Sequence, residues 1–129
     1  VPGDVPLATA VEFEQVIAAH LPAPAMTIVP ARDQQGSNCI ICSPPDSVAL
    51  RFGDNSFFPH LEAAHRASIQ PTICTLPGLG LDIDTPDDLA ELLARPADTL
   101  SHAYLDDSGI ARRLQEIQSD TSMKAAATA

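Results

Sequence analysis

The sequence predicts an α/β fold, in which helices pack on a sheet of short strands. The first observation is that short β-type runs alternate with helical segments up to about residue 118. The second is a pair of helix starts in which a threonine precedes an acidic first turn. Hydrophobic residues make up 45% of the 129 residues, which is enough for the core of one domain. We therefore predict one domain over residues 1–118 and a flexible tail over residues 119–129.

The first predicted helix begins after Thr9. Residues 1–7 read as the end of a strand that runs into a loop. Glu12 follows Thr9 by three residues and completes a capping box, in which each side chain accepts a hydrogen bond from the other residue's backbone. Pro22 lies just beyond the end of this helix. Its apolar side is marked by Val11, Phe13, Val16 and Ile17.

Two strands are predicted next. Residues 26–29 form a short β-type run that ends at Pro30, and residues 32–36 form a polar loop. Residues 37–42 form the second strand. It ends at the Ser-Pro-Pro sequence of residues 43–45, because proline cannot donate to a ladder.

A second helix is predicted over residues 57–67. The Gly-Asp-Asn-Ser turn of residues 53–56 precedes it, and either Asn55 or Ser56 is a suitable cap. Pro59 is compatible with the first helical turn. Residues 73–76 then read as a strand, and the Pro-Gly pair at 77–78 turns the chain.

The last elements are one brief strand and two helical segments. Residues 81–84 read as the strand. Thr85 and Pro86 begin a helix that runs to about Ala94, and the acidic residues of its first turn face the positive end of the helix dipole. Residues 99–118 are helical, with a break at the Ser-Gly pair of residues 108–109.

The charge balance restricts the partners. The chain carries 17 acidic and 7 basic residues, a formal net charge of −10, so we expect no broad electrostatic contact with nucleic acid. The acidic excess favours divalent cations instead. No apolar run approaches the ~20 residues that a membrane span needs. No basic-then-apolar leader opens the sequence, so we expect a cytoplasmic location without a membrane partner.

The three cysteines, Cys39, Cys42 and Cys74, fit a reducing compartment, because an odd number makes a poor disulfide framework. Cys39 and Cys42 form a C-x-x-C pattern inside a predicted strand. Their odd separation places the thiols on opposite faces of that strand. Packing in the core is therefore the favoured role, and a zinc or redox pair is the alternative.

Three aspartates suggest a cation site. Asp4 lies in a loop at a predicted strand end, where ligands of open α/β sheets bind. Asp82 and Asp84 are two residues apart on a β-type segment, so their carboxylates point to the same face. Such a set of oxygen ligands suits Mg²⁺. The alternative is that Asp84 only caps the helix that follows it.

Two polar loops are suited to an anion. Residues 36–38, Gly-Ser-Asn, enter a strand, and residues 53–56 enter a helix. Glycine turns and helix amino termini present backbone N–H groups that bind anions without lysine. The alternative is an ordinary turn and cap. His60 and His65 are five residues apart on a helix, so they cannot bind one metal from one face, and we expect exposed or structural roles.

Four segments together resemble one enzyme family. They are PGDVPL at residues 2–7, RD at 32–33 with GSN at 36–38, RFGDNSF at 51–57 with His60, and LDIDTPDDL at 81–89. In order and approximate spacing the chain resembles the 2-phospho-L-lactate guanylyltransferases over roughly residues 1–95. This group also includes the phosphoenolpyruvate and 3-phospho-D-glycerate guanylyltransferases, which make the precursor of coenzyme F-420.

The resemblance implies a MobA-like nucleotidyltransferase fold, which is Rossmann-like. It also implies transfer of GMP from GTP to a small phosphorylated carboxylic acid. Carried over residue by residue, Asp4, Asp82 and Asp84 correspond to the Mg²⁺ ligands. The contacts to the phosphorylated acid correspond to Ser37, Gly53 and Ser56, and Ser37 stands where the family usually has threonine.

The resemblance also implies that residues 1–118 are the carboxyl-terminal part of such a domain. The family's amino-terminal portion, with the basic glycine-containing loop that holds the triphosphate, has no counterpart here, and Lys124 is the single lysine. Four strands and four helices are also few for a doubly wound sheet. We therefore expect little transferase activity from the chain alone, and as partners a homodimer mate or the missing amino-terminal half. The alternatives are another MobA-like transferase and a non-catalytic metal- or anion-binding remnant that acts through a partner chain.

Overall fold

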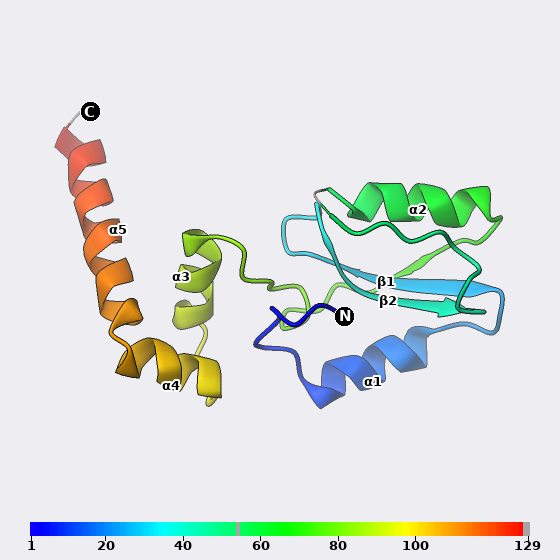
Figure 1. Cartoon of the computed structure of the whole chain (residues 1–129), viewed down its shortest axis with the longest axis horizontal. Helices are drawn as coiled ribbons and strands as arrows, with labels where there is room; N and C mark the ends of the chain where they lie inside the picture. Colours follow the sequence, from blue (N-terminus) through cyan, green and yellow to red (C-terminus); the bar gives the residue numbers. More distant parts are fainter. Residues whose placement is uncertain (54, 128–129) are drawn as a thin grey trace. The chain divides into compact units, whose positions relative to one another are not determined.

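The chain forms two units in the computed structural model, Val1–Asp82 and Ile83–Ala129. The structure describes residues 1–53 and 55–127. Strands and helices follow one another in the first unit, and the second unit is helical (Figure 1). The predicted α/β class is confirmed, whereas the boundary between residues 118 and 119 stays a prediction. Among the described residues, no helix has the length and apolar character to cross a bilayer.

Helix α1, Ala10–Ala19, begins at the predicted capping box. The backbone N–H of Glu12 donates to Thr9 Oγ1 at 3.2 Å, and the backbone N–H of Thr9 donates to Glu12 Oε2 at 3.3 Å. These two bonds satisfy N–H groups that have no partner within the helix. The start of α1 is therefore determined by residues three positions apart.

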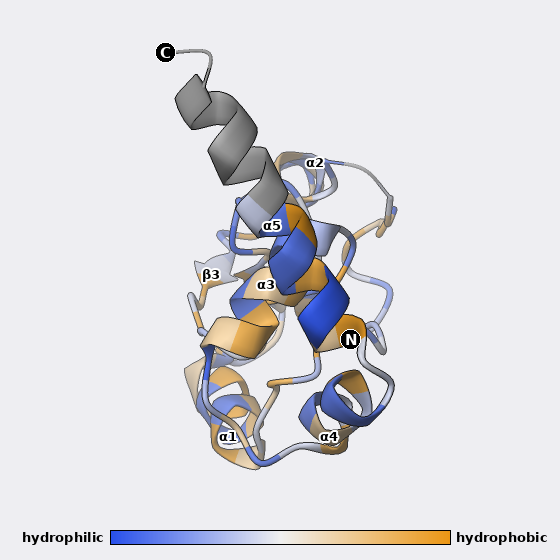
Figure 2. Ribbon diagram, turned by 90° about the vertical axis from the view of Figure 1, so that its left-hand side faces the viewer, coloured by the Kyte–Doolittle hydropathy of each residue, from blue (hydrophilic) through white to orange (hydrophobic). Residues whose placement is uncertain are grey.

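The predicted apolar side of α1 is only partly right. Val16 is buried and Phe13 is half-buried, but Val11 and Ile17 are 61% and 65% exposed. Glu12 is buried on the inner side of the helix, where a polar residue was not expected. Figure 2 shows hydrophobic and hydrophilic stretches alternating along α1. Which side of this helix faces the core is set by the sheet on which it packs.

Three strands form a mixed sheet in the order β2-β1-β3. Strand β1 is Ala25–Pro30, β2 is Ser37–Ser43 and β3 is Thr72–Ile73. Strand β1 pairs antiparallel with β2 and parallel with β3. The strands predicted at residues 26–29 and 37–42 are confirmed. The third is shorter than predicted and begins one residue earlier.

A shift of register interrupts the β1–β2 ladder at its end. Val29 is paired with Cys39, but Pro30 is paired with Ser37, so Asn38 is an extra residue in β2. An extra residue of this kind reverses the alternation of side chains and re-aims its neighbours. Ser37 consequently faces the same side of the sheet as Pro30 instead of the side that Cys39 faces.

Two apolar clusters lie on opposite faces of the sheet, and one helix covers each (Figure 1). Helix α2, Phe57–Arg66, covers one face and confirms the predicted helix. Helix α1 covers the other face. The α2-side cluster consists of Met26, Ile28, Val48, Phe57, Ala64 and Ile69. The α1-side cluster consists of Val5, Val16, Val29, Cys39 and Leu79.

The cysteines confirm the predicted alternation of β2. Cys39 belongs to the α1-side cluster, whereas Cys42 packs against the α2-side cluster. All three cysteines are free thiols. Burial raises the pKa of the Cys39 thiol and that of the Cys42 thiol, which keeps both protonated at neutral pH. Their role in packing is therefore confirmed.

Two predicted strands are wrong. Residues 1–7 and residues 81–84 are irregular in the structure, apart from a turn in the first segment. A β-type run becomes a strand only where a neighbouring strand accepts its ladder, and β1 already pairs with β2 on one side and β3 on the other. The prediction that the carboxylates of Asp82 and Asp84 point to the same face assumed a strand, and that assumption does not hold for this irregular segment.

Three helices form the described part of the second unit, residues 83–127. Helix α3, Pro86–Ala94, begins at the predicted Thr85 cap, and the structure adds a capping box between Thr85 and Asp88 that was not predicted from the sequence. Helices α4, Leu100–Asp107, and α5, Ile110–Ala127, confirm the predicted helical segment at 99–118 and its break at residues 108–109. Helix α5 continues past residue 118. The flexible tail stays a prediction, and its residues 128–129 lie outside the described part of the chain.

The carboxylate of Glu12 connects α1 to the turn before residue 81. Glu12 Oε1 accepts the backbone N–H of Gly78 at 2.7 Å, and Oε2 accepts that of Leu79 at 3.1 Å. Glu12 is 7% exposed, so these bonds offset its loss of hydration. A side chain at Gly78 would collide with the Leu7 carbonyl and with this carboxylate. Glycine is therefore required at this close approach.

We predict that Glu12→Gln destabilises the first unit by about 1.5–3 kcal/mol, because an amide NH₂ would replace one acceptor oxygen opposite backbone N–H donors. The measurement is urea denaturation followed by circular dichroism. Glu14→Gln is the matched control, since Glu14 is exposed on the same helix. Equal denaturation midpoints for the two variants would contradict the role of Glu12.

Candidate functional site

The start of β2 and the start of α2 meet at a buried polar cluster. Ser37 is the first residue of β2, and Ser56 is the amino-terminal cap of α2. They are 6% and 5% exposed, and His60 is 1% exposed. Two of the three predicted acid contacts therefore lie together, although 19 residues separate them.

Hydrogen bonds join these three side chains. The hydroxyl of Ser56 donates to Ser37 Oγ at 3.3 Å. Ser37 Oγ also lies 2.9 Å from His60 Nδ1. His60 is one helical turn after Ser56, and its backbone N–H donates to the Ser56 carbonyl at 3.1 Å. Ser37 is thus bound to two positions on one face of α2.

The second ring nitrogen of His60 determines its tautomer. The backbone N–H of Arg51 donates to His60 Nε2 at 3.0 Å. A backbone N–H can only donate, so Nε2 carries no proton and the neutral ring carries its proton on Nδ1. His60 Nδ1–H is therefore the donor to Ser37 Oγ.

The hydroxyl of Ser37 is left with a proton to donate. Its oxygen accepts two hydrogen bonds, from His60 Nδ1–H and from the Ser56 hydroxyl. No residue of the described ranges accepts the proton of Ser37 itself. A serine oxygen has two lone pairs and one O–H, so both lone pairs are in use and the O–H is available to an anionic ligand.

Gly53 follows the segment whose backbone is hydrogen-bonded to the same imidazole at Arg51. It lies two residues after Arg51, has a φ of +134°, and has open space where a Cβ would stand. This φ is in the region that favours glycine. Gly53 is exposed, so its backbone is accessible to a ligand. Asp54, the next residue of this predicted turn, lies outside the described residues.

The first turn of α2 offers fewer free amides than the sequence predicted. The backbone N–H of Phe57 donates to the Gln35 carbonyl at 2.9 Å, and Pro59 has no N–H. Ser56 was a predicted cap, yet its side chain makes no capping bond because it donates to Ser37. The serine hydroxyls are therefore better suited than the helix terminus to donate to an anion.

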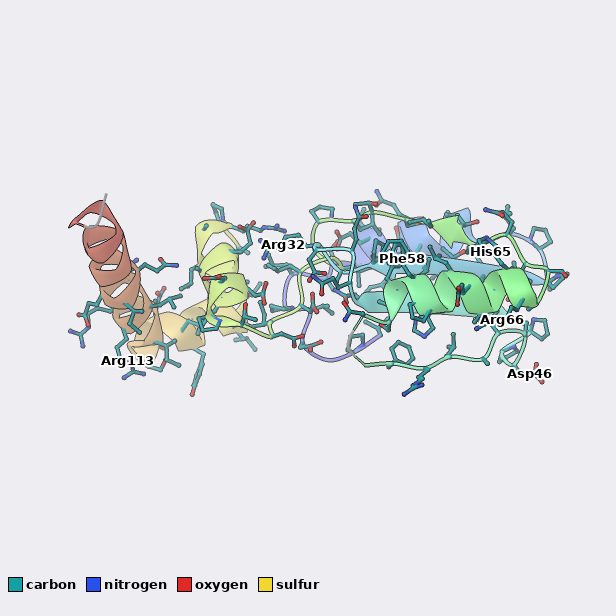
Figure 3. The ribbon with its side chains drawn as sticks, turned by 90° about the horizontal axis from the view of Figure 1, so that it is seen from above. Arg32, Asp46, Phe58, His65, Arg66 and Arg113 are labelled. Carbon is teal, nitrogen blue, oxygen red and sulfur yellow. The ribbon has the colours of Figure 1, made fainter. Side chains whose placement is uncertain are left out.

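The two histidines of α2 differ as their burial predicts. Burial lowers the pKa of His60 below the ordinary value of 6.5, since the charged ring would lose its hydration. The ring of Phe52 meets that of His60 edge-on, with centroids 5.1 Å apart. Figure 3 shows Phe58 near the start of α2 and His65 and Arg66 towards its end. His65 is exposed, whereas His60 is buried and structural, so each histidine has one of the two roles expected from the sequence.

Asp82 is fixed by Asn38, the extra residue of β2. Asn38 Nδ2 donates to Asp82 Oδ1 at 3.1 Å and to the Leu79 carbonyl at 3.0 Å. Asn38 is 3% exposed, and Asp82 is half-buried. The amide therefore holds one carboxylate oxygen in a defined orientation at the end of the first unit.

The other two predicted metal ligands are exposed. Asp4 lies in the irregular segment before α1. Asp84 precedes α3 in the second unit, where it and Arg113 line an open, mainly apolar groove of about 410 Å³. Figure 3 labels Arg113 on α5. Among residues 1–53 and 55–127, no group of three or more His, Cys, Asp or Glu side chains is gathered as a metal site. The magnesium site stays a prediction.

Sequence reasoning missed the connection through His60 and the role of Asn38. The separation of Ser56 and His60 by four residues was a signal, since such residues share one face of a helix. His60 and Ser37 are 23 residues apart in the sequence, so no local sequence pattern indicated the hydrogen bond between them. The extra residue in β2 likewise depends on pairing with β1.

The comparisons with known proteins agree on one family. Residues 1–125 match the family described as guanylyl transferase CofC like. The chain is 37% identical over 94 residues to a 3-phospho-D-glycerate guanylyltransferase of Colwellia psychrerythraea, a match that covers 73% of this chain and 44% of the relative.

Two further relatives bear different substrate names. A phosphoenolpyruvate guanylyltransferase of Rubrobacter xylanophilus is 32% identical, with 72% of this chain and 45% of the relative covered. A 2-phospho-L-lactate guanylyltransferase of Methanothermobacter thermautotrophicus is 31% identical, with 81% and 45% covered. The chain thus spans somewhat less than half the length of these curated relatives.

We predict that stability decreases through His60 as the pH falls below about 6.5. The folded state lowers the pKa of His60, so the unfolded state binds the proton more readily and the contribution is complete only above that value. The measurement is urea denaturation between pH 5 and 8. The stability advantage of the wild type over His60→Gln should shrink with falling pH, whereas that over the exposed control His65→Gln should not. A constant difference for both variants would contradict the prediction.

Proposed function

The chain belongs to the CofC-like guanylyl transferase family, and on this premise we propose that it contributes to the transfer of GMP from GTP to a small phosphorylated carboxylic acid. The relatives named above are guanylyltransferases of 3-phospho-D-glycerate, phosphoenolpyruvate and 2-phospho-L-lactate. These acids share a carboxylate and a phosphate. The proposed place of the reaction is the biosynthesis of coenzyme F-420 in the cytoplasm.

The hydroxyl of Ser37 is the observation that carries this proposal. It has a free O–H after accepting from His60 and from Ser56, in a chain with a net charge of −10 that offers few cations to an anion. A donor that is held in place by its neighbours binds an anion without rearrangement. We assign Ser37, Ser56 and the backbone at Gly53 to the phosphorylated acid.

The proposed step needs no general base. An oxygen of the acid's phosphate attacks the α-phosphorus of GTP and forms a new P–O bond. The bond from the α-phosphorus to the bridging oxygen breaks, and pyrophosphate leaves with the electron pair. A phosphate monoester has a second pKa of about 6, so the attacking oxygen is already ionised at neutral pH. The protein's contribution is therefore alignment of the two substrates.

Asp4, Asp82 and Asp84 are the proposed Mg²⁺ ligands. Carboxylate oxygens are the ligands that this ion prefers. The side-chain amide of Asn38 donates to one oxygen of Asp82, and hydrogen bonds of this kind orient the carboxylates that bind metal ions. Bound Mg²⁺ would neutralise charge on the phosphates. The MobA-like, Rossmann-like architecture is proposed with this site, and the α/β class with a mixed sheet supports it.

We predict that the chain binds a phosphorylated acid through the Ser37 cluster. Titration of ¹⁵N-labelled protein with each of the three acids should shift the amide signals of Ser37, Gly53 and Ser56. Ser37→Ala should raise the Kd about tenfold or more, the loss of one hydrogen bond to a charged group. Ser37→Thr, which keeps the hydroxyl, should bind within a few-fold of the wild type. Ser101→Ala in α4 is the control.

Shifts confined to other surfaces would exclude this assignment. Equal affinities of the wild type and Ser37→Ala would do so as well.

We predict little GMP transfer by the chain alone and measurable transfer when the part of the Rubrobacter xylanophilus relative outside the match is added. Pyrophosphate release is measured with Mg²⁺, with each acid or a sugar phosphate as acceptor, and with GTP, CTP or ATP. Preference for GTP with one of the acids supports the proposal. Preference for another nucleotide or for a sugar phosphate favours a different MobA-like transferase. Acid binding without turnover in either mixture favours a non-catalytic partner protein.

A further inference from the structure

We propose that His60 is a positioning residue for the phosphorylated acid. Its ring bridges the Ser37 hydroxyl and the backbone of Arg51, and this bridge directs the hydroxyl proton of Ser37 towards the ligand. The inference rests on the proposed function, because the ligand is the acid assigned to Ser37 there.

The direction of the hydroxyl follows from the order of the hydrogen bonds. The N–H of Arg51 donates to His60 Nε2 at 3.0 Å, which leaves the proton on Nδ1. Nδ1–H then donates to Ser37 Oγ at 2.9 Å. If the ring carried its proton on Nε2 instead, Ser37 would donate to Nδ1 and would have no proton for an anion. One backbone donor thus decides whether Ser37 can donate to the ligand.

The same ring connects all three predicted acid contacts. It bonds Ser37 directly, reaches Ser56 through the bond between the two hydroxyls, and holds the loop that leads to Gly53 through Arg51. Those three contacts come from the start of a strand, the start of a helix and a loop. A single side chain therefore keeps their spacing constant.

His60 does not itself contact a ligand in this arrangement. Both ring nitrogens have partners, the Phe52 ring lies against it, and the residue is 1% exposed. An imidazole with both nitrogens engaged does not take a proton from a substrate. Packing alone does not account for its polarity either, because a hydrophobic side chain would fill the position without the cost of burying a polar ring.

The first test needs no ligand. Two-bond ¹H–¹⁵N correlation spectra of the histidine rings at pH 7.5 distinguish the tautomers through their nitrogen shifts. We expect the His60 ring to be neutral with its proton on Nδ1. A proton on Nε2, or a doubly protonated ring, would overturn the inference whatever the acid does.

The second test is a double-mutant cycle on the affinity for phosphoenolpyruvate, used as the probe. His60→Leu and Ser37→Ala should each weaken binding about tenfold. If His60 acts through Ser37, the double variant should lose little more than either single variant. Independent losses that multiply to about a hundredfold would show that His60 does not act through this hydroxyl.

A conservative variant separates positioning from stability. His60→Gln keeps one donor and one acceptor, so it should bind phosphoenolpyruvate within about threefold of the wild type. His60→Leu should remain folded by circular dichroism yet bind about tenfold more weakly. If His60→Leu does not fold, the inference is tested by two other measurements. They are the affinity of His60→Gln relative to the wild type and the tautomer of the His60 ring. Weak binding by a His60→Gln variant that is folded by circular dichroism contradicts the inference.

The outcomes distinguish the two proposals. Lack of phosphoenolpyruvate binding, and of binding to the other two acids, by the wild type would contradict the proposed function. An acid-binding wild type with multiplicative losses in the cycle would contradict only the role of His60.

Discussion

Strand β1 is the constraint on which the first unit depends, because it is paired on both edges and buried on both faces. It pairs with β2 and β3, and all six of its residues are buried. Helices α1 and α2 cover opposite faces of the small sheet, so each apolar cluster rests on one side of this strand. A strand in this position cannot slip by one residue without exchanging the two clusters. The position of β1 therefore sets the register of the two strands that pair with it, β2 and β3.

The polar cluster of Ser37, Ser56 and His60 lies at the end of the ladder between β1 and β2. Ser37 begins β2 where the ladder with β1 ends, and α2 places Ser56 and His60 one turn apart. Side chains held by strands and helices move less than those held only by loops, which suits the proposed role of Ser37 as a donor to an anion. Gly53 is the exception, since it lies in a loop, and it is joined to the same imidazole through the backbone of Arg51.

The sequence predicted those features that depend on near neighbours and missed those that depend on distant ones. The capping box at Thr9 and the helix start at Thr85 were predicted correctly, because the residues that form each one lie within one helical turn. Residues 81–84 alternate like a strand but have no neighbour to pair with. The buried side of α1 and the bond between Ser37 and His60 are decided by tertiary packing. Ser37, Gly53 and Ser56 came from the family resemblance, while the polar loops that hold them could be seen from composition.

Because of the extra residue in β2, the adjacent side chains of Ser37 and Asn38 have different hydrogen-bond partners. Ser37 faces α2 and belongs to the polar cluster, whereas Asn38 faces the other way and holds Asp82. One peptide bond consequently links the proposed anion donor, Ser37, to the residue that orients Asp82, a proposed cation ligand. Changes of length in the loop at residues 32–36 can be absorbed by solvent-exposed chain. A change of length between Asn38 and Cys39 cannot, because it would reverse the faces to which Ser37 and Asn38 point, so insertions and deletions are expected in the loop and not at this step of the strand.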